Sequence, residues 1–186
     1  MHKFVFLSLS LLLFLFACGP TQTDQAGNDA PDAEQATSLH ESSAPSIATV
    51  DFAGLQDFMA EQEAEGELVV YNFWATWCRP CVAELPAFTK LHQAYADRGI
   101  KVVLVSLDFP DKKQQMEQFV AERDLQPAVI HLDDPDQDVW INGISPEWSG
   151  AIPATLLKGP AYRAFKEQGF TYEELQAWVD EALAQS

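Results

Sequence analysis

Basic residues are scarce in this chain. Its 186 residues include 11 Lys and Arg but 28 Asp and Glu, which gives a formal net charge of −17 at pH 7. Such an acidic surface repels the phosphate backbone of nucleic acids, so we exclude nucleic acid as a partner. The length and the 47% of hydrophobic residues are sufficient for one ordinary domain with a sizeable core, plus extensions.

Cysteine is also rare, and the N-terminal apolar run is too short to cross a membrane. The three cysteines, Cys18, Cys78 and Cys81, are too few for a disulfide framework. The run from Phe4 to Ala17 has 14 residues, whereas a transmembrane helix needs roughly 20. Because this run follows a short basic start, it predicts a signal peptide over residues 1–17, and hence export.

The end of the apolar run indicates how the exported chain is held. Leu15-Phe16-Ala17-Cys18 resembles a bacterial lipobox, in which cleavage before the cysteine leaves its thiol to be lipidated. The resemblance implies a lipoprotein that is anchored to a bacterial membrane through Cys18 and faces the periplasm or the cell exterior. The alternative is an ordinary signal peptide or an uncleaved anchor, in which Cys18 has no role.

Residues 18–50 have the composition of a tether. Between Gly19 and Val50 there is no Lys or Arg, and five acidic residues stand among small and polar ones. Because almost no large apolar side chain is available for burial, we expect a disordered linker. A flexible coil of this length has a root-mean-square reach of roughly 30 Å. The folded domain is therefore expected to span residues 51–186.

Apolar periodicity within this domain alternates between helix and strand. Leu68–Trp74 is continuously apolar, as in a strand buried on both faces, and Thr171 and Glu174 form a capping-box pair. The pattern predicts helices over 51–66, 78–96, 111–123 and 171–184, strands over 68–74, 101–107, 128–132, 154–157 and 162–166, and an irregular stretch over 133–153. The alternation predicts an α/β protein, which we expect to be a monomer.

The motif Trp77-Cys78-Arg79-Pro80-Cys81 lies where a predicted strand passes into the next helix. A C-x-x-C at such a junction places the first sulfur at a helix N-terminus and the second one turn later, where the two can close a small, reversible disulfide. The helix dipole and Arg79 both favour the thiolate of Cys78, which makes Cys78 the nucleophile. Cys81 faces inward and attacks the mixed disulfide that Cys78 forms with a partner.

Other uses of the cysteine pair fit the sequence less well. A zinc site normally has four ligands, and the scattered His40, His92 and His131 do not complete one, so no metal is expected. A purely structural disulfide closing two intervening residues constrains the unfolded chain little, and idle thiols do not suit an oxidising compartment. The acidic stretch 133–138 lacks the turn glycine and terminal glutamate of an EF-hand, so we interpret it as a solvated turn at a helix.

The segments FWATWCRPC, with ELP after it, and AIPATLL resemble the TlpA and ResA group of thioredoxin-like proteins, over about Asp51–Ser186. The resemblance implies a thioredoxin-like fold, with a central mixed sheet flanked by helices on both faces, and Ile152-Pro153 as a cis-proline opposite the disulfide. It also implies a reductase of disulfides in exported proteins, with cytochrome c maturation as one setting, electrons from a membrane partner and no soluble cofactor. The redox group is the Cys78–Cys81 dithiol itself.

Glu84 matches the acid that members of the ResA group carry beneath the active site. It lies three residues beyond Cys81, about one helical turn, so that its carboxylate would raise thiol pKa values by like-charge repulsion. The alternative is a solvated helix acid. Trp140 and Trp148 are candidates for a docking groove beside Pro153, or else core residues.

The sequence leaves the direction of exchange open. Stabilising the Cys78 thiolate through Arg79 favours an oxidant, whereas Glu84 favours a reductant. A disulfide-forming oxidant is therefore a second hypothesis. A third is a binding or chaperone module that uses the groove around Trp77 and Pro153.

Overall fold

The computed structural model describes residues 47–185. The predicted signal peptide over 1–17, the predicted lipidation site Cys18 and the predicted tether up to residue 46 lie outside the described residues. Within the part that is described, no helix combines the length and the apolar composition that crossing a membrane requires.

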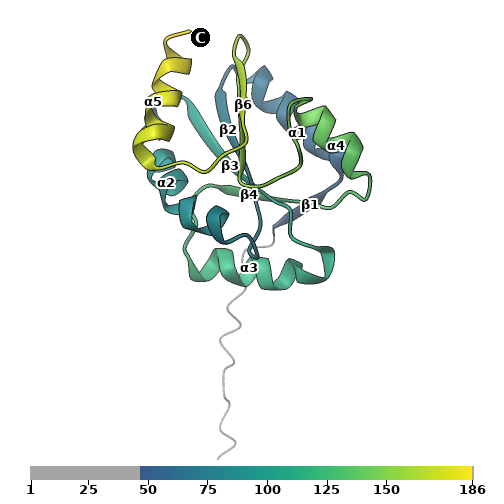
Figure 1. Cartoon of the computed structure of the whole chain (residues 1–186). Helices are drawn as coiled ribbons and strands as arrows, with labels where there is room; N and C mark the ends of the chain where they lie inside the picture. The colour runs from purple at the N-terminus through teal and green to yellow at the C-terminus, as the bar shows by residue number, and fades with distance from the viewer. Residues whose placement is uncertain (1–46, 186) are drawn as a thin grey trace, which may run out of the picture. The chain divides into compact units, whose positions relative to one another are not determined.

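A six-stranded sheet forms the centre of this domain, in the order β1-β4-β3-β2-β5-β6 (Figure 1). The pairs β1·β4, β4·β3 and β3·β2 are parallel, whereas β5 pairs antiparallel with both β2 and β6. The mixed sheet expected from the sequence is therefore confirmed. The strands are β1 Ala48–Val50, β2 Leu68–Trp74, β3 Ile100–Ser106, β4 Ala128–Leu132, β5 Ala154–Lys158 and β6 Arg163–Lys166.

Helices cover both faces of the sheet (Figure 1), and each face has its own apolar core. On one face α2, α3 and α5 contribute buried side chains such as Phe88, Met116 and Trp178. On the other face α1 and α4 contribute Leu55 and Trp140. The helices are α1 Phe52–Ala64, α2 Arg79–Tyr95, α3 Lys113–Glu122, α4 Gln137–Ile144 and α5 Tyr172–Leu183, with short 3-10 helices at Ala96–Arg98 and Pro110–Lys112.

Local sequence signals determine where two of the helices begin. The Asp51 carboxylate accepts a hydrogen bond from the Gly54 N–H at 2.8 Å and so caps α1. Thr171 and Glu174 form the predicted capping box at the start of α5. The helices and strands predicted from the sequence are confirmed, with ends that differ by at most two residues.

Strand β1 corrects the predicted boundary between tether and domain. It is an edge strand of the sheet and pairs with β4, and the Ile47 N–H donates to Glu117 Oε1 at 3.2 Å. Only three residues long and exposed at its first two, β1 has no apolar alternation that could reveal it in the sequence. The prediction that the tether extends to residue 50 is therefore wrong, because residues 47–50 belong to the folded domain.

Helix α4 lies in the stretch that was expected to be irregular, and that expectation is also wrong. Its eight residues bury Trp140 and Ile144, but they are too few to establish a helical period. The acidic turn that precedes α4 has a structural role, since the Asp134 carboxylate accepts the N–H of Phe52 at 3.0 Å and of Asp136 at 2.8 Å. The predicted turn at a helix thereby links the start of α1 to the start of α4.

Two buried tyrosines on opposite faces of the sheet give a test of this packing. Burial raises the pKa of Tyr71, and its hydroxyl has no hydrogen-bond partner among the described residues, whereas the Tyr95 hydroxyl donates to Asp180 Oδ1 at 2.9 Å. We expect Tyr71→Phe to raise the free energy of unfolding by about 1 kcal/mol, because an unsatisfied buried hydroxyl is costly. Tyr95→Phe should lower it by about 1 kcal/mol. Urea denaturation of the oxidised protein measures both, and equal losses would contradict the assignment.

Candidate active site

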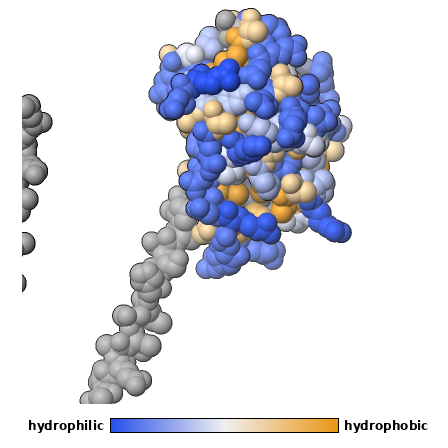
Figure 2. Space-filling view, turned by 90° about the vertical axis from the view of Figure 1, so that its left-hand side faces the viewer, coloured by the Kyte–Doolittle hydropathy of each residue, from blue (hydrophilic) through white to orange (hydrophobic). Residues whose placement is uncertain are grey.

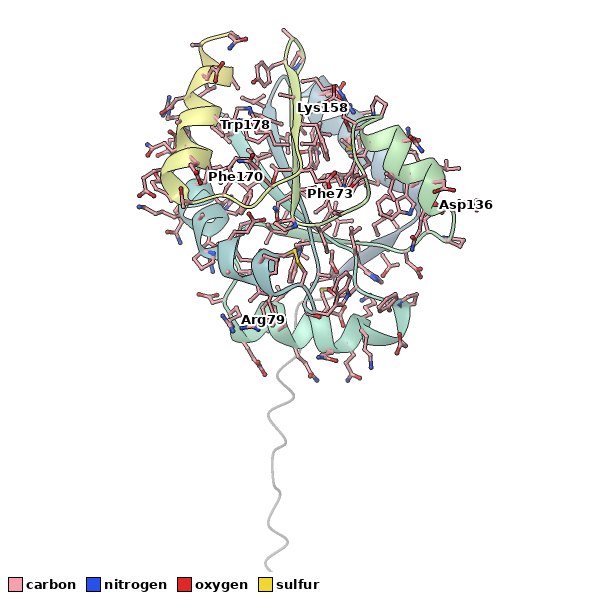
Figure 3. All side chains as sticks on the ribbon, in the orientation of Figure 1. Phe73, Arg79, Asp136, Lys158, Phe170 and Trp178 are labelled. Carbon is pink, nitrogen blue, oxygen red and sulfur yellow. A yellow bond between two sulfur atoms is a disulfide. The ribbon has the colours of Figure 1, made fainter. Side chains whose placement is uncertain are left out.

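Cys78 and Cys81 form a disulfide at the beginning of α2, with an S–S distance of 2.02 Å (Figure 3). Strand β2 ends at Trp74, and the Cys78 N–H donates to the Ala75 carbonyl at 3.1 Å, which closes the turn between strand and helix. Cys78 is the N-cap of α2 and has extended backbone angles. The predicted pairing of the two cysteines at a strand-to-helix junction is confirmed.

The two sulfurs have different surroundings. Cys78 is 5% exposed and Cys81 is fully buried. The Cys81 N–H points at Cys78 Sγ, 3.3 Å away. In the reduced protein this N–H and the positive end of the α2 dipole favour a thiolate at Cys78.

The loop before β5 faces the disulfide. The peptide bond between Ile152 and Pro153 is cis, as expected from the resemblance. The Ile152 carbonyl oxygen lies 3.7 Å from Cys78 Sγ. The Trp148 indole N–H donates to the Ala151 carbonyl at 2.8 Å, which fixes the approach to this loop.

Glu84 is a buried acid, 5% exposed, on the inner face of α2. Its Oε1 accepts from Asn72 Nδ2 and its Oε2 accepts from the Phe170 N–H, both at 2.8 Å. Burial raises the pKa of Glu84 to about 7, although the bonds from Asn72 and Phe170 lower it. The alternative of a solvated helix acid is therefore wrong.

Glu84 lies close to the cis-proline. A Cβ added at Gly169 would be 3.6 Å from Glu84 Oε2 and 3.6 Å from Pro153 Cγ. The carboxyl group and the proline ring thus both lie near Gly169. Glu84 and the loop before β5, which the resemblance places opposite the disulfide, therefore lie close together.

An exposed aromatic pair borders the site. Trp77 is 55% exposed and stacks on Phe109, which is 58% exposed, with ring centroids 6.1 Å apart. Trp77 and Ile152 also line a cavity of about 250 Å³. The two tryptophans that were candidates for a docking groove, Trp140 and Trp148, are both buried. Trp140 also lines this cavity, whereas Trp148 packs against other aromatic rings of the core. The neighbouring Arg79 and Pro80 are exposed.

Asp108 is a part of the site that the sequence did not predict. It is 2% exposed, and its carboxylate accepts the Thr76 N–H at 3.1 Å, the Thr76 hydroxyl and the Ser106 hydroxyl. The Asp108 carbonyl oxygen lies 2.9 Å from His131 Nε2. These bonds hold the loop before Cys78 to the end of β3. The position of this acid directly after the buried 101–107 run is a signal that could have pointed to it.

Comparison with known proteins gives a consistent picture. The AhpC/TSA family matches residues 27–159. The thiol-disulfide oxidoreductase ResA of Oceanobacillus iheyensis is 44% identical over 69 residues, 37% of this chain and 35% of that protein. ResA of Geobacillus thermodenitrificans is 32% identical over 116 residues, 62% of this chain and 61% of that protein. The chain therefore matches from about a third to three fifths of the length of these curated relatives.

Solved structures share the fold. The crystal structure of a putative thiol:disulfide interchange protein DsbE from Chlorobium tepidum superposes with a TM-score of 0.53 at 24% identity, over 68% of this chain and 84% of that one. The likeness confirms the thioredoxin-like fold, with its mixed sheet and flanking helices.

The raised pKa of Glu84 predicts how stability depends on pH. Between its ordinary value of 4.5 and about 7, the folded protein holds a proton that the unfolded chain has lost. The stabilisation is therefore complete below about pH 4.5 and is lost as the pH rises through about 7. We expect the free energy of unfolding of the oxidised wild type to fall by about 3 kcal/mol over this range relative to Glu84→Gln. Urea denaturation across the range tests this, with the exposed Glu122→Gln as control; parallel curves for all three proteins would contradict it.

The reduced form of the same variant tests how Glu84 acts on the thiols. With Cys18 replaced by Ser, Cys78 and Cys81 are the only thiols in the chain. If the carboxylate repels a nearby thiolate, Glu84→Gln lowers the thiol pKa values. Thiolate absorbance against pH measures them, and a titration that matches the wild type would leave Glu84 without an electrostatic role.

Proposed function

The chain belongs to the AhpC/TSA family, and we propose that it is a membrane-tethered, extracytoplasmic thiol-disulfide oxidoreductase that reduces disulfides of exported proteins. The observation that carries the proposal is the Cys78–Cys81 disulfide at the N-terminus of α2, facing the cis Ile152-Pro153 bond. The names of the ResA relatives, at 32% to 44% identity, support the same activity.

The reaction is a balanced exchange of two electrons and two protons. The Cys78 thiolate attacks one sulfur of the substrate disulfide, and the other substrate sulfur leaves with the electron pair and takes up a proton. Cys81 then gives up its proton and attacks Cys78 Sγ, which releases the second substrate thiol. The substrate disulfide becomes a dithiol, and the Cys78–Cys81 pair becomes the disulfide seen in the structure.

Charges around the cysteines support the reducing direction. The Arg79 guanidinium, which favours the Cys78 thiolate, is exposed and therefore screened by water. The Glu84 carboxylate, which disfavours a thiolate, is 5% exposed and acts through a medium of lower dielectric constant. A dithiol whose thiolate is less stabilised gives up its electrons more readily.

The exchange needs protein partners but no soluble cofactor, because the dithiol is itself the redox group. Substrates are exported proteins that present a disulfide to Cys78 beside Trp77 and Ile152. A membrane protein with a dithiol of its own supplies the two electrons that reduce Cys78–Cys81 again. We propose a monomer, since exchange requires open access to the exposed face around Trp77.

The first test separates the roles of the two cysteines. In Cys81→Ser the resolving thiol is absent, so the mixed disulfide on Cys78 persists. Expressed in the native host, Cys81→Ser should accumulate covalent adducts that disappear on reduction, whereas Cys78→Ser should accumulate few, because Cys81 is fully buried. Non-reducing electrophoresis and mass spectrometry identify the adducts.

The outcomes distinguish the competing functions. Equal trapping by both variants would refute the assignment of nucleophile and resolving thiol. Trapping by neither would favour a binding or chaperone module. Apocytochromes with a C-x-x-C-H site among the adducts would support a role in cytochrome c maturation, and a broad set of proteins with structural disulfides would support the oxidising alternative.

The membrane anchor is proposed from the lipobox-like end of the signal peptide at Cys18. A lipid on this thiol holds the domain at the outer face of the membrane from which its electrons come. Cys18→Ala should abolish acylation and the cleavage that precedes it. Mass spectrometry of the mature N-terminus decides the matter: an unmodified Cys18 in the wild type would disprove the anchor.

A further inference from the structure

A groove lined by no acidic residue runs between α2 and α3. It comprises two cavities of about 290 Å³ and about 510 Å³ that share lining residues, among them Phe119 and Arg123. Thr76 and Arg79 line the end nearest the disulfide, and Lys90 lines the far end. The groove therefore begins at the active-site loop and continues along α2.

The basic residues of the groove are not neutralised by the protein itself. Five basic side chains within residues 47–185 form ion pairs with carboxylates, namely Arg98, Lys101, Lys112, Lys113 and Lys158. Arg79, Lys90 and Arg123 form none within the same part of the chain. Glu122 and Asp124 flank Arg123 in sequence, but neither lines the groove. Lys90 lies over the Tyr172 ring at 3.6 Å, but it too has no carboxylate partner within residues 47–185. In a chain with a net charge of −17, three cations without a carboxylate partner around one groove indicate a site for negative charge.

Apolar side chains make up part of the groove lining, which also includes one buried polar atom without a hydrogen-bond partner. Leu85, Phe119 and Leu125 are among its lining residues, and the Arg123 guanidinium lies over the Phe119 ring at 5.1 Å. The Thr89 hydroxyl oxygen is buried and has no hydrogen-bond partner among the described residues. Figure 2 views this side of the domain, where apolar surface shows low on the face between hydrophilic groups.

The cavity beside Trp77 and Ile152 has the opposite charge. It shares no lining residue with the groove, and its lining includes Asp108, Asp133 and Asp134. Figure 3 shows Arg79 at the edge of the domain toward α3, on the side of the groove. The disulfide thus adjoins two recesses that differ in sign.

We propose that the groove between α2 and α3 binds an acidic, partly aliphatic segment that flanks the reactive cysteine of a redox partner protein. The inference rests on the proposed function, because the partner is held while its cysteine is bonded to Cys78. The polypeptide extends from Cys78 past Arg79 into the groove, its carboxylates pair with Arg79, Arg123 and Lys90, and its aliphatic side chains cover Phe119. Charge complementarity and continuity with the active site select this occupant.

Synthetic peptides with one cysteine test the proposal directly. The cysteine is activated as a 2-thiopyridyl disulfide. The flanking segment is Leu-Glu-Leu-Asp or the matched amide Leu-Gln-Leu-Asn, and each segment is placed before the cysteine in one peptide and after it in another. Reduced full-length protein with Cys18→Ser attacks the peptide sulfur, and 2-thiopyridone leaves and is followed by absorbance. When the acidic segment is on the side of the cysteine that reaches the groove, we expect this peptide to react about fivefold faster than its amide twin at low salt. This difference in rate should become smaller at high salt.

Arg123→Glu and Arg98→Glu are the matched variants. Both replace an exposed arginine that lies over an aromatic ring, Phe119 and Tyr95 respectively, and both change the charge equally. Arg123→Glu should abolish the advantage of the acidic peptide over its amide twin, whereas Arg98→Glu should retain that advantage. Arg123→Gln, which removes the charge without reversing it, should reduce the advantage and serves if Arg123→Glu does not fold.

The remaining outcomes each decide a different question. Equal rates for acidic and amide peptides would overturn the inference while the proposed function stands, and failure of both peptides to react would overturn the proposed function. The preference for the acidic peptide could also grow when the chain's own N-terminal acids are changed to amides, namely Asp24, Asp29, Asp32, Glu34 and Glu41. That result would assign the groove to the chain's own acidic segment instead. If sedimentation shows a dimer, and Arg123→Glu converts it to a monomer, the groove would be assigned to a second copy of the chain.

Discussion

The pairing of β2 with its two neighbours is the constraint on which the site depends. β2 is buried along its entire length, and its end continues into the loop that carries the cysteines. On one side it pairs with β3, after which comes Asp108, and on the other with β5, before which comes Pro153. Because side chains alternate across a sheet, a slip of one residue in either pairing would exchange the two faces. The same register that packs the core therefore brings the cysteines, the acid and the proline together.

Burial determines the ionisation of Glu84. The carboxyl group keeps two hydrogen bonds, yet its pKa is raised because water is excluded from it. An amide at this position would keep the packing and lose the ionisable group. The protein thus carries, on the inner face of the helix that begins at Cys78, a group that is costly when ionised.

The parts of the site that the sequence predicted are those formed by residues that are consecutive in the chain. The run 68–74 is long and apolar, and the C-x-x-C directly after it fixes a helix N-terminus, so strand, loop and disulfide follow from local pattern. The cis bond at Pro153 followed from resemblance alone, because proline isomer state has no compositional signal. Strand β1 could not be predicted, since its only reason to be extended is its pairing with β4, about 80 residues away in sequence. Asp108 and the groove between α2 and α3 likewise depend on contacts between distant segments.

The difference in charge between the two recesses beside Cys78 has a consequence for the choice of sulfur. A substrate disulfide contains two sulfur atoms, and a nucleophile in free solution attacks either of them. Aspartates line the recess on the Trp77 side, and Arg79 and Arg123 line the other. In the proposed exchange, a polypeptide with an uneven charge distribution would meet this field in one preferred direction, which would favour one of its two sulfurs for attack by Cys78. The charges around Cys78 would then bias the regiochemistry of the proposed exchange, and with it which substrate cysteine is released first.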